Sequence, residues 1–216
     1  MTISFKDFVS TFWKHLIHLI KANMAFLLFC VPVVTIPAAI TGLYSICTDV
    51  VQGNTEGVLK TYVSAIKRSF LKSFALTSVF GMLFIIAATG IRFYLTFMEQ
   101  NLFAMIPEGI ALAVALVAGA MIPYSFIMLA KTDLKLKDIL KNAFLLVFLE
   151  IKATALSFCI SFFFAFVMMA NFTGFYVVIL LIGISIVAYV GTYFSLYGVL
   201  KRVVPKMAEV NYDITE

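Results

Sequence analysis

Two histidines are the side chains of this sequence whose chemistry is easiest to recognise. His15 and His18 lie three positions apart, so on a helix they share one face, and Asp7 is the nearest carboxylate in the sequence. Imidazole and carboxylate groups together can hold a zinc ion, but no His-Glu-x-x-His pattern completes such a site. We therefore expect the histidines to pack at a membrane interface, and we expect no metal, cofactor or catalytic residue.

Arg92 is the one basic residue that falls within a long apolar run, and Glu99 follows seven positions later on about the same helical face. An ionisable residue at membrane depth is a candidate functional residue because a charge in hydrocarbon is costly. Arg92 can instead reach the outer head groups or pair with Glu99. We keep both residues as candidates for contacting a partner or lining a polar cavity.

The composition of the sequence indicates that these histidine, arginine and glutamate residues lie in or beside membrane helices. Of 216 residues, 63% are hydrophobic and 12% are charged, and the mean hydropathy is +1.07. Soluble domains have roughly 45–50% apolar and 25% charged residues, so a water-soluble globule is excluded. The net charge of +5 comes from basic blocks between the apolar runs. Membrane topology explains these blocks, so we expect the lipid bilayer and no nucleic acid as a partner.

Four apolar runs, residues 74–98, 106–130, 153–170 and 175–200, each have the length of one helical crossing. The predicted fold is an all-α polytopic membrane helical bundle. A further run, residues 22–48, contains Pro32 and Pro37, which a straight helix does not accommodate. Either it crosses once with a broken middle, or residues 12–31 turn at the prolines and residues 38–51 return, giving five or six crossings.

The distribution of positive charge predicts the orientation. Links 99–105 and 171–174 carry no Lys or Arg, whereas the other links are basic. The positive-inside rule places the basic blocks and the C-terminus of this multi-pass protein on the cytoplasmic side of the cell membrane. If the first segment forms a hairpin, Lys6, Lys14 and Lys21 also face the cytoplasm, and we prefer this alternative. One observation argues against the hairpin, since residues 38–51 span only about 21 Å as a helix.

Basic amphipathic stretches at residues 5–21, 58–73 and 134–152 each lead into apolar sequence, and we expect them at the cytoplasmic surface. They divide a single membrane domain into units 1–52, 53–130 and 131–216. The second and third units suggest a parallel duplication. Its signature is Ala65, Phe70, Ala75 and Phe80, which recur 78 positions later as Ala143, Phe148, Ala153 and Phe158.

Two further patterns favour helix contacts. Ala111, Ala115 and Gly119 have small-xxx-small spacing, which allows two helices to approach closely. Tyr189 and Tyr193 begin a tyrosine stripe, continued by Tyr197, that either lines a polar cavity or packs as part of an interfacial belt.

One motif points to a family. Asn23 is followed by Pro32-Val-Val-Thr35-Ile and then by a run of small residues that contains Thr41 and ends at Tyr44. This order resembles the N-terminal signature of YesL-like membrane proteins, although Pro37 stands where that family usually has Gly and Gly42 where it usually has Ala. The resemblance implies a small bacterial integral membrane protein of a kind often encoded near carbohydrate uptake and glycan-degradation systems.

The motif also has a physical interpretation. A proline break in the membrane frees backbone carbonyls, which Thr35, Thr41 or Asn23 could satisfy. The same groups could instead face a polar solute or a partner helix. Five motif residues are therefore candidates for a partner contact or a polar cavity: Asn23, Pro32, Thr35, Thr41 and Tyr44.

The resemblance favours a non-enzymatic accessory component of bacterial carbohydrate uptake, which binds ABC-type transporter subunits through small-residue faces and basic helices. The alternative is a solute-binding membrane subunit, like the substrate-capturing subunit of an energy-coupling-factor transporter. An intramembrane enzyme would need clustered acids or histidines within its helices, and the sequence lacks them.

Overall fold

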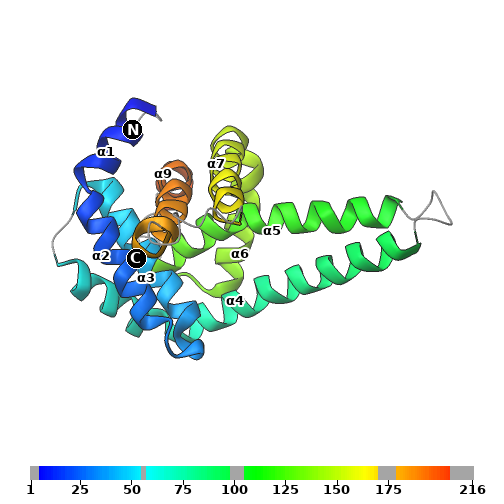
Figure 1. The fold of residues 1–216 in the computed structure, drawn as a ribbon, viewed down its shortest axis with the longest axis horizontal. Helices are drawn as coiled ribbons and strands as arrows, with labels where there is room; N and C mark the ends of the chain where they lie inside the picture. Colours follow the sequence, from blue (N-terminus) through cyan, green and yellow to red (C-terminus); the bar gives the residue numbers. More distant parts are fainter. Residues whose placement is uncertain (1–4, 55–56, 98–104, 170–178, 205–216) are drawn as a thin grey trace, which may run out of the picture.

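A computed structural model describes residues 5–54, 57–97, 105–169 and 179–204 (Figure 1). These residues form helices and no strand, as predicted for an all-α bundle. In chain order, the helices are α1 (Phe5–Lys14), α2 (Leu16–Phe29), the 3-10 turn η1 (Val33–Thr35), α3 (Ile36–Gln52), α4 (Val58–Phe97), α5 (Met105–Lys131), α6 (Leu136–Leu149), α7 (Ile151–Met169), the π-helical turn η4 (Ile179–Gly183) and α9 (Ile184–Arg202).

Within the described residues, four helical segments are long and apolar enough to cross a membrane: Val33–Gln52, Val58–Phe93, Ile106–Lys131 and Leu181–Arg202. The bent pair formed by α6 and α7 adds a fifth if it is counted as one span. Five lies within the predicted range of five to six. A sixth crossing would fall to α2, whose 14 residues reach only about 21 Å.

The first apolar segment breaks where the prolines stand. α2 ends at Phe29, η1 follows Pro32, and α3 turns back along α2 (Figure 1). Pro37 lies in the first turn of α3, a position that proline tolerates because the amide there has no helical partner. α3 therefore starts earlier than the predicted return at residue 38, and its 17 residues reach about 25 Å. Gly53, at φ 78°, ends it.

The second amphipathic stretch is continuous with the membrane span that follows it. α4 runs unbroken for 40 residues, about 60 Å, from Val58 to Phe97. Its predicted apolar face is buried at Tyr62 and Ile66, whereas Lys67 is exposed. α3 covers this face, since the Tyr62 hydroxyl donates a 2.8 Å hydrogen bond to the Ala39 carbonyl. The stretch is thus one end of a long helix and not a separate surface helix.

The N-terminal amphipathic stretch is divided at His15 into α1 and α2. The Phe8 ring of α1 stacks on Tyr189 of α9 at 5.2 Å between ring centroids and meets Tyr193 edge-on at 5.1 Å. The Tyr189 hydroxyl donates a 3.0 Å hydrogen bond to the Phe8 carbonyl. This part of the tyrosine stripe is therefore a packing surface for α1, one of the two predicted alternatives.

The third unit differs from the second. α6 and α7 meet at Glu150 at an angle of 96°. In the second unit, the amphipathic stretch and the first crossing instead form one continuous helix, α4. The Glu150 carboxylate accepts a 2.8 Å hydrogen bond from Nε of Arg202, which ties this bend to the end of α9. The duplication remains a prediction.

The small-residue face of α5 packs against other helices of the same chain. A Cβ atom added at Gly90 of α4 would lie 3.4 Å from the Ala111 Cβ, and one at Gly119 would lie 3.2 Å from the Phe158 ring of α7. These close approaches are what small-xxx-small spacing permits. Part of the face that we predicted to meet a transporter helix is thus occupied by α4 and α7.

Candidate functional site

Asn23 joins the N-terminal motif to the last helix. Its side chain is fully buried in α2, and Oδ1 accepts a 3.1 Å hydrogen bond from the backbone amide of Ser185. Ser185 is the second residue of α9, directly after the π-helical turn η4 runs into that helix. Asn23 therefore ties α2 to the junction of η4 and α9.

Thr35 satisfies backbone groups at the proline break. Its hydroxyl donates to the carbonyl of Phe29 at the end of α2 and lies 2.6 Å from the carbonyl of Pro32. Thr35 thus satisfies a carbonyl at the break, which is one of the two roles that the motif left open for it. Pro32 itself is exposed and precedes η1.

Thr41 lies in the contact between α3 and α4. It is fully buried, its hydroxyl donates to the Pro37 carbonyl at 3.3 Å, and it shares a 2.7 Å hydrogen bond with Ser73 of α4. Thr41 thus binds a neighbouring helix of the same chain.

Tyr44 extends from α3 to a cavity between three other helices. Its ring stacks on Phe126 of α5 at 5.6 Å, and its hydroxyl is 3.5 Å from where a Cβ of Gly191 would stand. The cavity, which we call the central cavity, has a volume of about 250 Å³. α5, α7 and α9 contribute the other lining residues: Gly119, Ala120, Ile122, Pro123, Tyr124, Thr154, Ser157, Phe158, Ser161, Phe162, Val187, Gly191 and Ser195.

Local sequence explains why this space exists. Pro123 stands inside α5 and has no amide hydrogen to donate to the carbonyl of Gly119, four residues earlier. Gly119 and Gly191 carry no side chain into the cavity, and a Cβ at Gly191 would lie 3.2 Å from Pro123. The two glycines therefore let α5, α7 and α9 pack closely around the cavity, and Pro123 leaves one backbone carbonyl without its helical donor.

The lining is mostly carbon with hydroxyl groups among it, and no charged side chain is among the described residues that form it. The Tyr124 hydroxyl and Thr154 Oγ1 share a 2.8 Å hydrogen bond. Ser195 is fully buried beside Tyr124, and its side chain interacts with the Tyr124 hydroxyl. Together these hydroxyls give the lining groups that can hydrogen-bond to a neutral ligand or to water.

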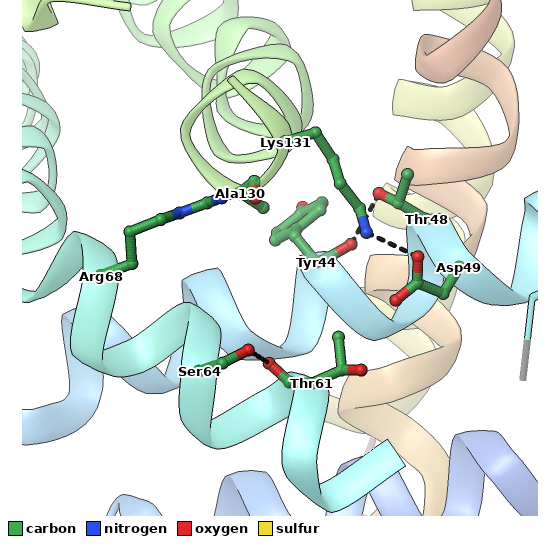
Figure 2. Close-up of polar contacts among 8 residues, drawn as sticks. All are labelled: Tyr44, Thr48, Asp49, Thr61, Ser64, Arg68, Ala130 and Lys131. Atoms are coloured by element: carbon green, nitrogen blue, oxygen red, sulfur yellow. Dashed lines mark hydrogen bonds and ion pairs between the residues drawn. The ribbon is translucent and has the colours of Figure 1, made fainter. Parts of the chain in front are cut away.

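A second polar cluster lies where α3, α4 and α5 meet (Figure 2). The Lys131 ammonium lies 2.5 Å from a carboxylate oxygen of Asp49, and Arg68 donates to the Ala130 carbonyl. The Thr61 carbonyl accepts a 2.9 Å hydrogen bond from Ser64. Lys131 is the last residue of α5, and the Arg68 side chain reaches the same helix end from α4. The helix dipole favours cations at this end. This cluster fastens helix ends together.

Of the other predicted pair, Arg92 is exposed near the C-terminal end of α4 and belongs to neither cluster, and Glu99 lies outside the described residues. Among the residues that the structure describes, no group of three His, Cys, Asp or Glu side chains could hold a metal ion. The His15 and His18 rings lie 5.6 Å apart, edge to face.

Sequence reasoning missed most of the central cavity. Only Tyr44 was a candidate, whereas Thr154, Ser157 and Ser161 also line it. These three hydroxyls recur at positions i, i+3 and i+7 of an otherwise apolar helix, which places them on one face. That spacing was the signal that could have revealed a polar face on α7.

A family model with the description "Protein of unknown function, DUF624" matches residues 19–91. This range contains the motif from Asn23 to Tyr44 and most of α4. No curated protein and no solved structure matches the chain. The chain is similar to that family over its N-terminal helices, and its apolar helices are those of a membrane protein.

Proposed function

We propose that this chain is a non-enzymatic accessory component of bacterial carbohydrate uptake, which binds the membrane subunits of an ABC-type transporter. The link to carbohydrate uptake rests on the resemblance of the motif to YesL-like proteins. The family match over residues 19–91 supports it, since the match covers that motif.

The proposed docking surface is the part of the α4–α5 hairpin that projects beyond the other helices (Figure 1). Large apolar side chains are exposed on both helices there, for example Ile86 and Phe93 on α4 and Ile110 on α5. A Cβ added at Gly109 of α5 would meet nothing within 4 Å. An outward-facing glycine in a membrane helix allows a second helix to approach closely, and this observation carries the proposal.

Affinity purification of the tagged chain from native membranes, followed by mass spectrometry, tests this proposal. We expect transporter subunits to be recovered with the unmodified chain and lost with Gly109→Leu. Ala155→Leu, on the exposed face of α7, is the matched control and should keep them. Recovery of the unmodified chain alone, or equal recovery of transporter subunits with both variants, would reject docking through this hairpin.

The central cavity favours a second candidate, a solute-binding membrane subunit. A neutral ligand would suit its uncharged lining, in which the hydroxyls of Ser157, Ser161 and Ser195 can hydrogen-bond to it. Thermal stabilisation by a panel of sugars and vitamins tests it. A stabilising compound should lose its effect in Ser195→Val, and a panel without any stabilising compound counts against this candidate.

We also propose that the basic ends of the helices, and with them the C-terminus, face the cytoplasm. The ion pairs Lys131–Asp49 and Arg202–Glu150 hold these helix ends together, and the basic residues near them favour the cytoplasmic side by the positive-inside rule.

A further inference from the structure

A groove separates α2 from the first turn of α4, away from the central cavity. Its volume is about 640 Å³. Cationic side chains, Lys21 of α2 and Lys60 of α4, contribute to its lining together with His18. The remaining lining is largely apolar and includes Met24 and Leu28.

The exposed side chains of α1 and α2 show how this groove lies relative to a membrane. Trp13, 66% exposed, and Lys14 stand at the junction of the two helices, and both residue types favour the membrane–water interface. Lys21 follows about two turns later. Beyond it the exposed side chains are Met24 and Leu28 and, past the end of α2, Val31. Apart from Ile17, which is 65% exposed between the two lysines, the exposed face thus changes from interfacial to hydrocarbon-like along its length.

The groove follows the same change in polarity. From Lys21 to Leu28 is seven residues, about 10 Å along the helix, compared with about 15 Å for the hydrocarbon of one leaflet. One end therefore presents Lys21 at the depth of lipid phosphates, the other end presents carbon at the depth of acyl chains, and Lys60 lines the same groove from α4.

We propose that this groove binds one anionic phospholipid. Its phosphate lies between Lys21 and Lys60, and one acyl chain lies along Met24 and Leu28. The positive end selects an anionic head group over a zwitterionic one. The apolar end selects a lipid over a free phosphate ion, because an ion would leave that surface uncovered.

Native mass spectrometry of the full chain, with phosphatidylglycerol added, tests the proposal. We expect one tightly retained lipid and about thirtyfold weaker retention in the double variant Lys21→Gln, Lys60→Gln, on the basis of the attraction of each lysine to an anionic surface. The matched control is Lys137→Gln, Lys141→Gln, which removes two exposed lysines from α6. It should retain the lipid as the unmodified chain does.

Four further measurements separate the contributions of the head group, the acyl chains and the fold. Phosphatidylcholine and inorganic phosphate should bind at least tenfold more weakly than phosphatidylglycerol, and dibutyryl phosphatidylglycerol should also bind more weakly, because its chains are too short to fill the groove. Lys21→Arg, Lys60→Arg should keep the lipid. Equal binding of phosphatidylcholine, equal binding of phosphate, or equal loss in the α6 control would each overturn the proposal.

Discussion

Asn23 and Ser185 are 162 positions apart in the sequence, yet the Asn23 carboxamide oxygen accepts a hydrogen bond from the Ser185 amide in the buried interior. The first apolar helix thereby fixes the start of the last one. Replacing Asn23 with Leu removes the acceptor and leaves a buried amide without it. We expect a loss of about 1–3 kcal/mol in the free energy of unfolding, seen as a lower thermal midpoint. Asn54→Ala, at an exposed site, is the control, and an unchanged midpoint in Asn23→Leu would show that this hydrogen bond does not stabilise the fold.

The hydrogen bond between Thr41 and Ser73 predicts a measurable coupling between α3 and α4. Thr41→Val and Ser73→Ala, alone and together, form a double-mutant cycle. Interhelical hydrogen bonds in membrane proteins contribute on average about 0.6 kcal/mol, so we expect a coupling energy of that order. Additive effects of the two substitutions on the unfolding free energy would show that the hydroxyls do not interact.

His15 predicts a dependence of stability on pH. Burial, and then the charges of neighbouring Lys14 and His18, lower the pKa of His15 below its ordinary value of 6.5. The unfolded chain therefore binds the proton first as the pH falls, and stability decreases below about pH 6.5. The thermal midpoint should fall between pH 7.5 and 5.5, and His15→Gln should reduce that fall. An equal fall in His15→Gln would assign the effect to other groups.

The ion pair between Lys131 and Asp49 predicts a small, recoverable loss. Both side chains are partly exposed, so Asp49→Asn should lower the free energy of unfolding by no more than about 1 kcal/mol. The exchange Asp49→Lys with Lys131→Asp should recover part of the stability lost by Asp49→Lys alone. Chemical denaturation of the three variants measures this, and no recovery in the exchanged protein would argue against direct pairing.

The proposed orientation predicts which side of the membrane each helix end faces. In a cysteine-free background, Glu108→Cys near the start of α5 should react with an impermeant maleimide in intact cells. Lys137→Cys on α6 should react only after the cells are permeabilised. The reverse pattern would invert the topology.

Local sequence was sufficient to predict the helices and the first break. Long apolar runs specify membrane helices, because only internal hydrogen bonds satisfy the backbone in lipid. The proline spacing predicted the break between α2 and α3, and Thr35 satisfies the carbonyl of Phe29 there, as the motif suggested. These outcomes depend on residues within a few turns of one another.

The rest depends on contacts between distant segments. The 96° bend at Glu150 carries no proline signal, and it lies beside Arg202, which is far away in the sequence. The central cavity likewise arises where Pro123 of α5 faces Gly191 of α9. Neither pairing can be derived from periodicity, because periodicity identifies the face of a helix but not the helix that covers it.

The unbroken length of α4 has a structural consequence. Its 40 residues contain no proline, so one hydrogen-bonded helix of about 60 Å joins the projecting hairpin to Tyr62. The Tyr62 hydroxyl in turn binds the Ala39 carbonyl of α3. The hairpin surface and the N-terminal motif are therefore connected by a single helix, with no loop between them.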